Sequence, residues 1–237
     1  MPSFDEIICK LKELKKQGYI KTHRSGPTGI GKTLEDLLGI KENNIPGPDI
    51  GEEIELKSAR KNAVSMVTLF TKAPLPRKVN SYLLKEFGYV TPDSKGEKIL
   101  HTTVSGTDFN KLRGEIGFKV VFEDLRLKLK SNKKTEIEAY WDETILRKCF
   151  EKKLPKLTYV KADSKGAGKN EEFWFNEAYL LSGFNFENLV KLVKSGDVLV
   201  DIRIGQYPDG RPHDHGTGFR VQPSKLDLCF KNRIKLI

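Results

Sequence analysis

Three residues between Pro48 and Lys57 have the types and spacing that phosphodiester hydrolysis requires. Side chains alternate across a strand, so Glu55 and Lys57 share one face, and Asp49 can reach that face from the preceding turn. Magnesium favours a few carboxylates together with water and phosphate oxygens, so Asp49 and Glu55 are candidate Mg²⁺ ligands. Lys57 could orient the nucleophile and offset charge that develops on the phosphate. The same alternation also occurs on ordinary edge strands, so the pattern alone leaves a solvated surface open.

A second motif, Gly26–Thr33, matches the phosphate-binding loop of nucleotide hydrolases, and Val198–Asp201 imitates the strand that holds their magnesium. That loop works because a buried strand delivers it to a helix N-terminus. The preceding residues, Lys16–Ser25, are too polar to form a buried parallel strand. The alternative is a glycine-rich loop leading into a helix that carries Glu35, where Lys32 could contact a DNA phosphate.

The elements that must position these residues can be read from capping signals and hydrophobic periodicity. Ser3 and Glu6 have the spacing of a capping box for a helix that ends at Gly18. Further helices are expected at 34–38, 80–87, 142–151 and 185–194 and from Ser224, and strands at 53–58, 64–70, 198–204 and 219–221, with a hairpin over 119–130 that turns near Asp124. The order lacks regular βαβ alternation and shows no clear domain boundary, which indicates a mixed α/β protein.

Composition narrows the classes of partner. The net charge of +10 over 237 residues favours a polyanion, because Lys and Arg near phosphates release condensed counterions. No window reaches the ~18 apolar residues of a membrane span, and the N-terminus lacks a signal-peptide layout. Cys9, Cys149 and Cys229 are far apart and odd in number, so we expect reduced thiols in a cytoplasmic protein without a membrane partner.

Several blocks of sequence, in the same order along nearly the whole chain, resemble one known family. They are Gly29–Leu38, Leu69–Pro74, Ile99–Gly106, Val200–Gly205 and His213–Val221. The chain resembles the MvaI/BcnI family of Type II restriction endonucleases, which are MutH-like members of the PD-(D/E)XK superfamily, and the MvaI branch is the nearer. The resemblance implies a restriction-endonuclease-like α/β fold, in which helices flank a mixed β-sheet and two lobes surround a DNA cleft.

The resemblance also implies an activity and a set of catalytic residues. We expect a monomer that cuts both strands of DNA at CC(A/T)GG or a close variant with Mg²⁺, protected in its host by a companion DNA methyltransferase. Catalytic roles fall on Glu35, Asp49, Glu55 and Lys57. In the MvaI branch one residue fewer separates the aspartate from the glutamate, which leaves the roles of Glu52 and Glu53 open. A MutH-like repair nickase would use the same residues, and a nucleotide hydrolase is a weaker alternative.

Base recognition requires side chains that match base edges, such as arginine for guanine and aspartate for the cytosine amino group. Asp201 and Arg203 alternate on one strand face, although they could equally form a surface ion pair. His213 and His215 share a face and could instead bind a metal. With the resemblance, the expected DNA contacts are Lys32, Arg60, Lys72, Asp201, Arg203, Tyr207, His213, Asp214, His215 and Arg220.

The lobes expected are 1–105 for catalysis and 106–237 for recognition, within one MutH-like unit spanning 1–237. Arg126, Lys128 and Lys130 read as solvated surface.

Overall fold

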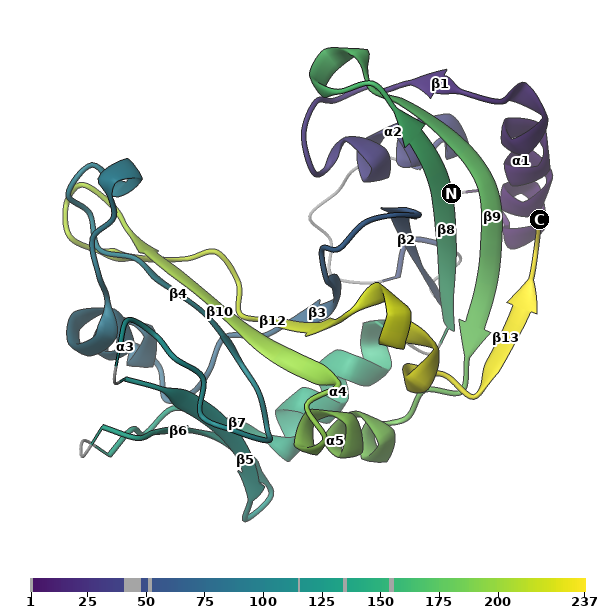
Figure 1. The fold of residues 1–237 in the computed structure, drawn as a ribbon. Coiled ribbons are helices and arrows are strands. Elements are labelled where there is room, and N and C mark those ends of the chain that lie inside the picture. Colours follow the sequence, from purple (N-terminus) through teal and green to yellow (C-terminus); the bar gives the residue numbers. More distant parts are fainter. Residues whose placement is uncertain (1, 41–47, 51–52, 115, 134–135, 154–155) are drawn as a thin grey trace. The chain divides into compact units, whose positions relative to one another are not determined.

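The computed structural model describes residues 2–40, 48–50, 53–114, 116–133, 136–153 and 156–237 (Figure 1). The chain folds into two compact units, each discontinuous in sequence. Unit 1 comprises Met1–Ser65, Glu151–Asn185 and Asp227–Ile237, and unit 2 comprises Met66–Phe150 and Phe186–Leu226. The contiguous lobes expected from the sequence, 1–105 and 106–237, differ from this division, because the chain returns to unit 1 for a long hairpin and for its last strand.

Unit 1 is built on one mixed sheet. Its strands are ordered β1 (Ile20–Lys21), β9 (Glu172–Ser182), β8 (Lys156–Lys165) and β2 (Ile54–Arg60), and β13 (Asn232–Lys235) also pairs with β9. β2 runs parallel to β8, whereas the other pairings are antiparallel. β2 therefore lies at an edge of the sheet formed by the described residues.

Two helices cover the apolar face of this sheet. α1 (Phe4–Gln17) begins with the expected capping box between Ser3 and Glu6 and packs along β9 (Figure 1). α2 (Gly29–Leu38) ends at Gly39 in the left-handed conformation and packs against β2. Their buried faces form a core with alternate residues of the strands: Ile7, Leu11, Ile30, Leu34, Leu38, Ile54, Leu56, Val160, Ala162, Phe173 and Phe175. Ile54 and Leu56 of β2 point into this core, so the alternate residues of β2 lie on the opposite face of the sheet.

Unit 2 contains two antiparallel sheets. The first is ordered β11 (Pro212–Asp214), β10 (Val198–Gln206), β12 (Gly218–Val221) and β3 (Val67–Thr71), and β4 (Leu100–Val104) also pairs with β10. The second is β5 (Phe118–Glu123), β6 (Arg126–Ser131) and β7 (Tyr140–Asp142). The helices that begin in unit 2 are α3 (Val79–Phe87), α4 (Glu143–Lys153) and α5 (Phe186–Lys194). Short 3-10 segments lie at Pro92–Ser94 and Pro223–Cys229, and another, Gly168–Asn170, lies in unit 1.

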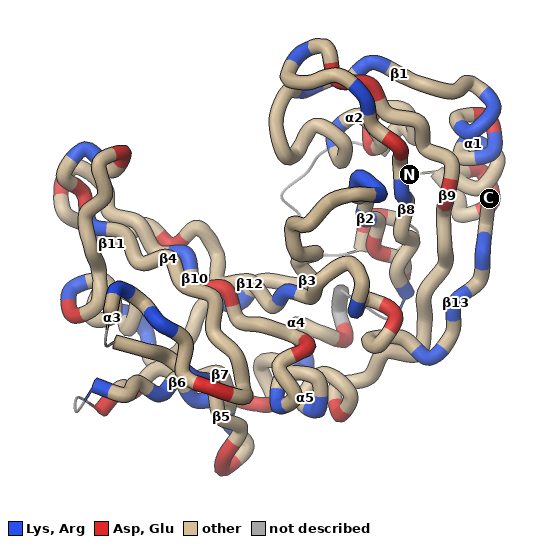
Figure 2. The backbone as a smooth tube through the Cα atoms, viewed as in Figure 1, with Lys and Arg blue, Asp and Glu red and all other residues tan. Residues whose placement is uncertain are grey.

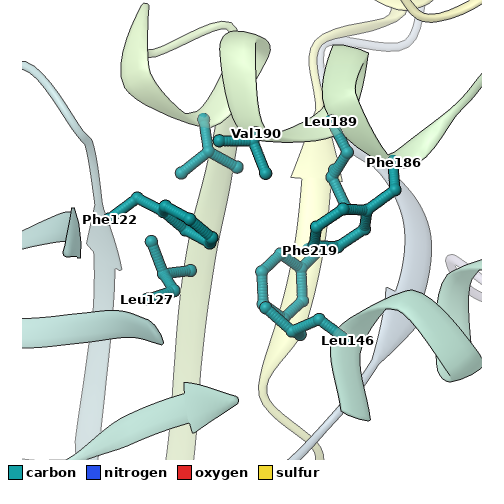
Figure 3. A pocket seen from close by; sticks show the side chains of 8 residues that line it. Phe122, Leu127, Leu146, Phe186, Leu189, Val190 and Phe219 are labelled. Atoms are coloured by element: carbon teal, nitrogen blue, oxygen red, sulfur yellow. The ribbon is translucent and has the colours of Figure 1, made fainter. Parts of the chain in front are cut away.

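Unit 2 also contains a hollow of about 10 Å³ (Figure 3). Its lining is entirely apolar: Phe122, Leu127, Leu146, Phe186, Leu189, Val190, Val193 and Phe219. A space of this size is at the lower limit for one water molecule, and the lining offers water no polar side chain. The hollow is therefore a gap in core packing rather than a ligand site.

Most expected elements are present, two expectations need correction, and one hairpin was not expected. The strand expected from residue 64 begins at Val67, and Val64 is 90% exposed because it precedes the sheet. The helix expected from Ser224 is a 3-10 segment. The long β8–β9 hairpin at the centre of unit 1 was missed. No helix in the described ranges has the length and apolarity needed to cross a membrane.

Candidate active site and recognition surface

Glu55 and Lys57 lie on the same face of β2, as the alternation predicted. Lys57 Nζ donates a hydrogen bond of 2.8 Å to Glu55 Oε1. Glu55 is 5% exposed, and Lys57 lies opposite Tyr159 of β8. Figure 2 shows acidic and basic positions together on this strand. The arrangement places a buried carboxylate beside a lysine ammonium group.

Asp49 is fixed to the same strand by its own backbone. Its N–H donates to Ile54 O at 3.1 Å, and its Oδ2 accepts a hydrogen bond of 2.9 Å from the N–H of Leu56. Leu56 is the residue between Glu55 and Lys57, so the Asp49 carboxylate lies against the open edge of β2 at the level of both side chains. The structure thus brings together the three residues that the sequence predicted.

The acidic groups fit a magnesium ion. Glu55 Oε2 is buried, and no donor in the described part of the chain is bonded to it. A buried carboxylate oxygen without a partner is costly, and a cation would remove that cost. Magnesium typically takes one or two protein carboxylates and fills its remaining positions with water and phosphate oxygens, which suits a site with Asp49 and Glu55. No cluster of three or more His, Cys, Asp or Glu residues occurs among the described residues.

The neighbouring acids are less suited to this role. Glu53 forms an exposed ion pair with Lys156 at 2.9 Å, and Glu52 lies outside the described residues. Glu35 is carried by α2 to β2: a Cβ at Gly31 would stand 4.0 Å from Glu35 Oε1 and 3.9 Å from Ser58 Oγ. Its membership of the active site therefore stays a prediction.

The glycine-rich loop before α2 differs from a nucleotide-binding loop. The strand that precedes it, β1, is two residues long and pairs antiparallel at the sheet edge. Lys32 Nζ forms a 2.8 Å ion pair with Asp36, which also accepts from His23, and both contacts lower the pKa of Asp36. Thr33 is buried and its hydroxyl donates to Gly29 O. Among the described residues, the strand that leads into this loop is therefore not the buried parallel strand that a phosphate-binding loop requires.

Arg60, expected to contact DNA, is held inside unit 1. Its Nε and Nη2 each donate a 2.6 Å hydrogen bond to the carboxylate of Glu171, which is 8% exposed. The guanidinium also donates to the carbonyls of Gly26 and Pro27 at 3.3 and 3.4 Å and lies over the Phe173 ring. These contacts favour a structural role, in which Arg60 fastens the glycine-rich loop to the sheet.

The polar face of the unit 1 sheet continues beyond β2 with residues that the sequence reading missed. Lys161 on β8 lies 5.8 Å from the centre of the Tyr159 ring and 5.9 Å from that of Tyr179. Burial raises the pKa of Tyr159 to about 12, so this hydroxyl stays protonated. A hydrogen bond to Glu177 raises the pKa of Lys61. Alternation along residues 156–165 was the available signal, and these side chains share the face of Lys57.

Unit 2 places Asp201, Arg203 and Arg220, which are expected to read bases, on one face of its first sheet. Asp201 is 1% exposed; its Oδ2 accepts a hydrogen bond from Arg203 Nε and forms an ion pair with Arg220 Nη1, both at 2.8 Å. Thr103 Oγ1 donates to the other carboxylate oxygen at 2.9 Å. The ion pair left open by the sequence is therefore present, and Arg220 joins it from a different strand.

Aromatic side chains lie next to this cluster. The rings of His213 and His215 are 4.1 Å apart, Tyr207 stacks on His213 at 4.6 Å, and His101 lies 6.2 Å from His215. Burial, followed by Arg203 and His215, lowers the pKa of His101, which the sequence reading did not include. The sequence feature that could have identified His101 is its position in Ile99–Gly106, one of the blocks that resemble the family.

The two remaining expected contacts are also in unit 2. Asp214 accepts from Asn80 Nδ2 and from the N–H of Gly216, both at 2.8 Å. The backbone N–H of Lys72 donates to Thr217 O, and Lys72 is half-buried. Arg126 and Lys128, expected at the surface, pair with Asp142 and Asp124, which matches a solvated face.

A mixed α/β fold that holds two carboxylates and a lysine at an edge strand is typical of metal-dependent nucleases. A model of the MvaI/BcnI restriction endonuclease family matches residues 8–230. Two solved structures, each 32% identical over 100% of both chains, are similar: a restriction endonuclease MvaI–cognate DNA substrate complex, TM-score 0.88, and restriction endonuclease MvaI in the absence of DNA, TM-score 0.61. None of the curated proteins compared with the chain matches it. The chain belongs to the MvaI/BcnI restriction endonuclease family, so it is a deoxyribonuclease, and the expected resemblance and fold class are confirmed.

Proposed function

We propose that this restriction endonuclease cuts both strands of duplex DNA with Mg²⁺, using Asp49, Glu55 and Lys57. The observation that carries the assignment is the buried Glu55 Oε2, which has no bonded donor among the described residues, next to the anchored carboxylate of Asp49. Family membership supports metal dependence, which is typical of these enzymes. Glu35, which α2 brings to β2, is included as a fourth acidic residue of the site.

The protein's own groups account for positioning and charge. Asp49 and Glu55 would hold Mg²⁺, which supplies Lewis-acid activation of the phosphate and a more acidic water. Lys57 already donates to Glu55 Oε1, so its ammonium group is held at the site and offsets charge that develops on the phosphate oxygens. The backbone bond from Leu56 to Asp49 keeps that carboxylate fixed, so little reorganisation is needed when substrate binds.

The proposed substrate is duplex DNA containing CC(A/T)GG or a close variant, bound by a monomer. Support comes from the similar solved structure, which is a complex of restriction endonuclease MvaI with cognate DNA. The cluster around Asp201, Arg203 and Arg220 offers the guanidinium groups that match guanine edges. Tyr207, His213, Asp214 and His215 border it, and Lys32 and Lys72 are proposed as phosphate contacts that position the duplex. A companion methyltransferase would protect host DNA in the cytoplasm.

Digestion of unmethylated plasmid with Mg²⁺, followed by sequencing of the ends, tests this proposal. We expect discrete fragments whose ends share one motif. Asp49→Ala and Glu55→Ala should abolish cleavage and retain DNA binding, whereas Glu53→Ala, which removes an exposed ion-paired acid of the same strand region, should cut normally. Nicked circles alone would indicate a nickase, and cleavage by Asp49→Ala would refute the active-site assignment.

A further inference from the structure

Asp201 is poorly placed to contact a DNA base directly, because its carboxylate is buried. Oδ2 accepts a hydrogen bond from Arg203 and forms an ion pair with Arg220, Oδ1 accepts from the Thr103 hydroxyl, and the residue is 1% exposed. A cytosine amino group would have to reach a buried carboxylate and compete with these three partners for it. Losing a charge-assisted hydrogen bond inside a protein is costly, so direct reading of a base by Asp201 is disfavoured.

Three strands converge to build this cluster. Asp201 and Arg203 are alternate residues of β10, Thr103 is the β4 residue opposite Asp201, and Gly218 of β12 is opposite Asp201 on the other side. A Cβ at Gly218 would stand 2.9 Å from Arg220 Nε, so the absence of a side chain there lets the Arg220 chain lie across the strand toward the carboxylate. The pairing is thus a product of sheet register.

The charges explain why a carboxylate is needed at this position. Two guanidinium groups that approach the same point repel each other, and one buried carboxylate between them offsets that repulsion. The cluster of Asp201, Arg203 and Arg220 keeps a net charge of +1, which attracts electronegative base edges and phosphates. Arg203 contacts Asp201 through its Nε, and its side chain is 42% exposed, which favours contact between its terminal nitrogens and a ligand.

We infer that Asp201 is a positioning residue that presents Arg203 and Arg220 as a fixed pair to two neighbouring guanines of the substrate. The inference rests on the proposed function. Arg203 would pair end-on with O6 and N7 of one guanine, the geometry in which arginine distinguishes guanine from the other bases. Because both arginines contact one oxygen atom, their guanidinium groups lie close together, which suits neighbouring bases stacked about 3.4 Å apart.

The test measures selectivity rather than activity. Binding of Asp201→Asn is compared, without divalent metal, on the duplex identified by end sequencing and on duplexes in which each guanine is replaced by adenine or 7-deazaguanine. The unchanged protein should prefer guanine by roughly ten- to a hundredfold at each position. Asp201→Asn should reduce that preference to about threefold or less at both guanines and retain binding to unrelated DNA, because its positive charge near phosphate increases.

Two further variants keep the inference falsifiable. Asp197→Asn, which removes the charge of an ion-paired aspartate elsewhere in unit 2, should preserve selectivity. Thr103→Val keeps both ion pairs and removes the hydrogen bond from the Thr103 hydroxyl to Asp201, so it should partially reduce guanine selectivity. If Asp201→Asn does not fold, unchanged guanine selectivity in Thr103→Val overturns the inference.

The possible failures are distinguishable. Full guanine selectivity in folded Asp201→Asn overturns the positioning role. The positioning role is also overturned if Asp201→Asn loses selectivity at one cytosine only and the unchanged protein binds more weakly to a cytosine analogue that lacks the amino group. Asp201 would then read that base directly. Absence of any sequence preference in the unchanged protein refutes the proposed function instead.

Discussion

Replacing Arg60 with alanine separates a structural role from the DNA contact expected from sequence. The Arg60 and Glu171 side chains are 24% and 11% exposed and share two hydrogen bonds of 2.6 Å. Breaking a fully buried pair costs about 3–5 kcal/mol, whereas an exposed pair contributes about 0–1 kcal/mol. This pair lies nearer the buried limit, so we expect a loss of about 2–3 kcal/mol, which for a chain of this size lowers Tm by roughly 4–12 °C.

The assay can report on unit 1 by itself. The chain has two tryptophans, Trp141 in unit 2 and Trp174 in unit 1, so a Trp141→Phe background leaves Trp174 as the single fluorescent reporter during urea unfolding. Adding Glu171→Ala to Arg60→Ala should recover part of the loss, because the unpaired carboxylate is removed as well. An unchanged unfolding midpoint, combined with weaker DNA binding and a salt dependence reduced by about one phosphate, would show that Arg60 contacts DNA instead.

Three other perturbations have defined outcomes. Gly205→Ala places a Cβ 3.0 Å from His215 Nε2, so the ring must shift, and selectivity between cognate and altered duplexes should fall while the Tm of unit 2 changes little. Burial lowers the pKa of His101 in the folded state below its ordinary value of 6.5. As the pH falls, this histidine is therefore protonated first in the unfolded chain, so the free energy of unfolding should decrease with acidification. In urea titrations, His101→Gln should weaken this decrease between about pH 7.5 and about pH 5.5. Lys161→Ala should weaken binding to all duplexes alike and reduce the salt slope by about one, and a sequence-dependent loss would contradict a phosphate contact.

Local patterns predicted the parts of the fold that depend on neighbouring residues. The capping box of α1 and the shared face of Glu55 and Lys57 are of this kind, because both follow from spacing alone. The β8–β9 hairpin was missed for a physical reason. Its pairing shifts by one residue at Lys161 and Ala162, so the core-facing positions of β9 change from Phe175 to Ala178 and interrupt the alternation.

Partners distant in sequence were beyond local patterns. Arg60 looked like a free cation at the end of a strand because its partner, Glu171, is 111 residues away. Arg220 reaches Asp201 only because β12 pairs with β10 in one register. Strand pairing therefore determines which charged side chains are paired within the protein and which remain available to a ligand. A short sequence motif contains no information on that pairing.

One short sequence pattern occurs on two strands of this protein with different partners. Glu55 and Lys57 on β2, and Asp201 and Arg203 on β10, are each a buried acid followed after one residue by a cation. Asp201 receives a second guanidinium and a hydroxyl, so its negative charge is used within the protein. Glu55 receives one ammonium group, and its other oxygen has no bonded donor among the described residues. Because an unsatisfied buried carboxylate oxygen favours a cation, the third partner supplied by the sheet separates a positioning acid from a proposed metal ligand.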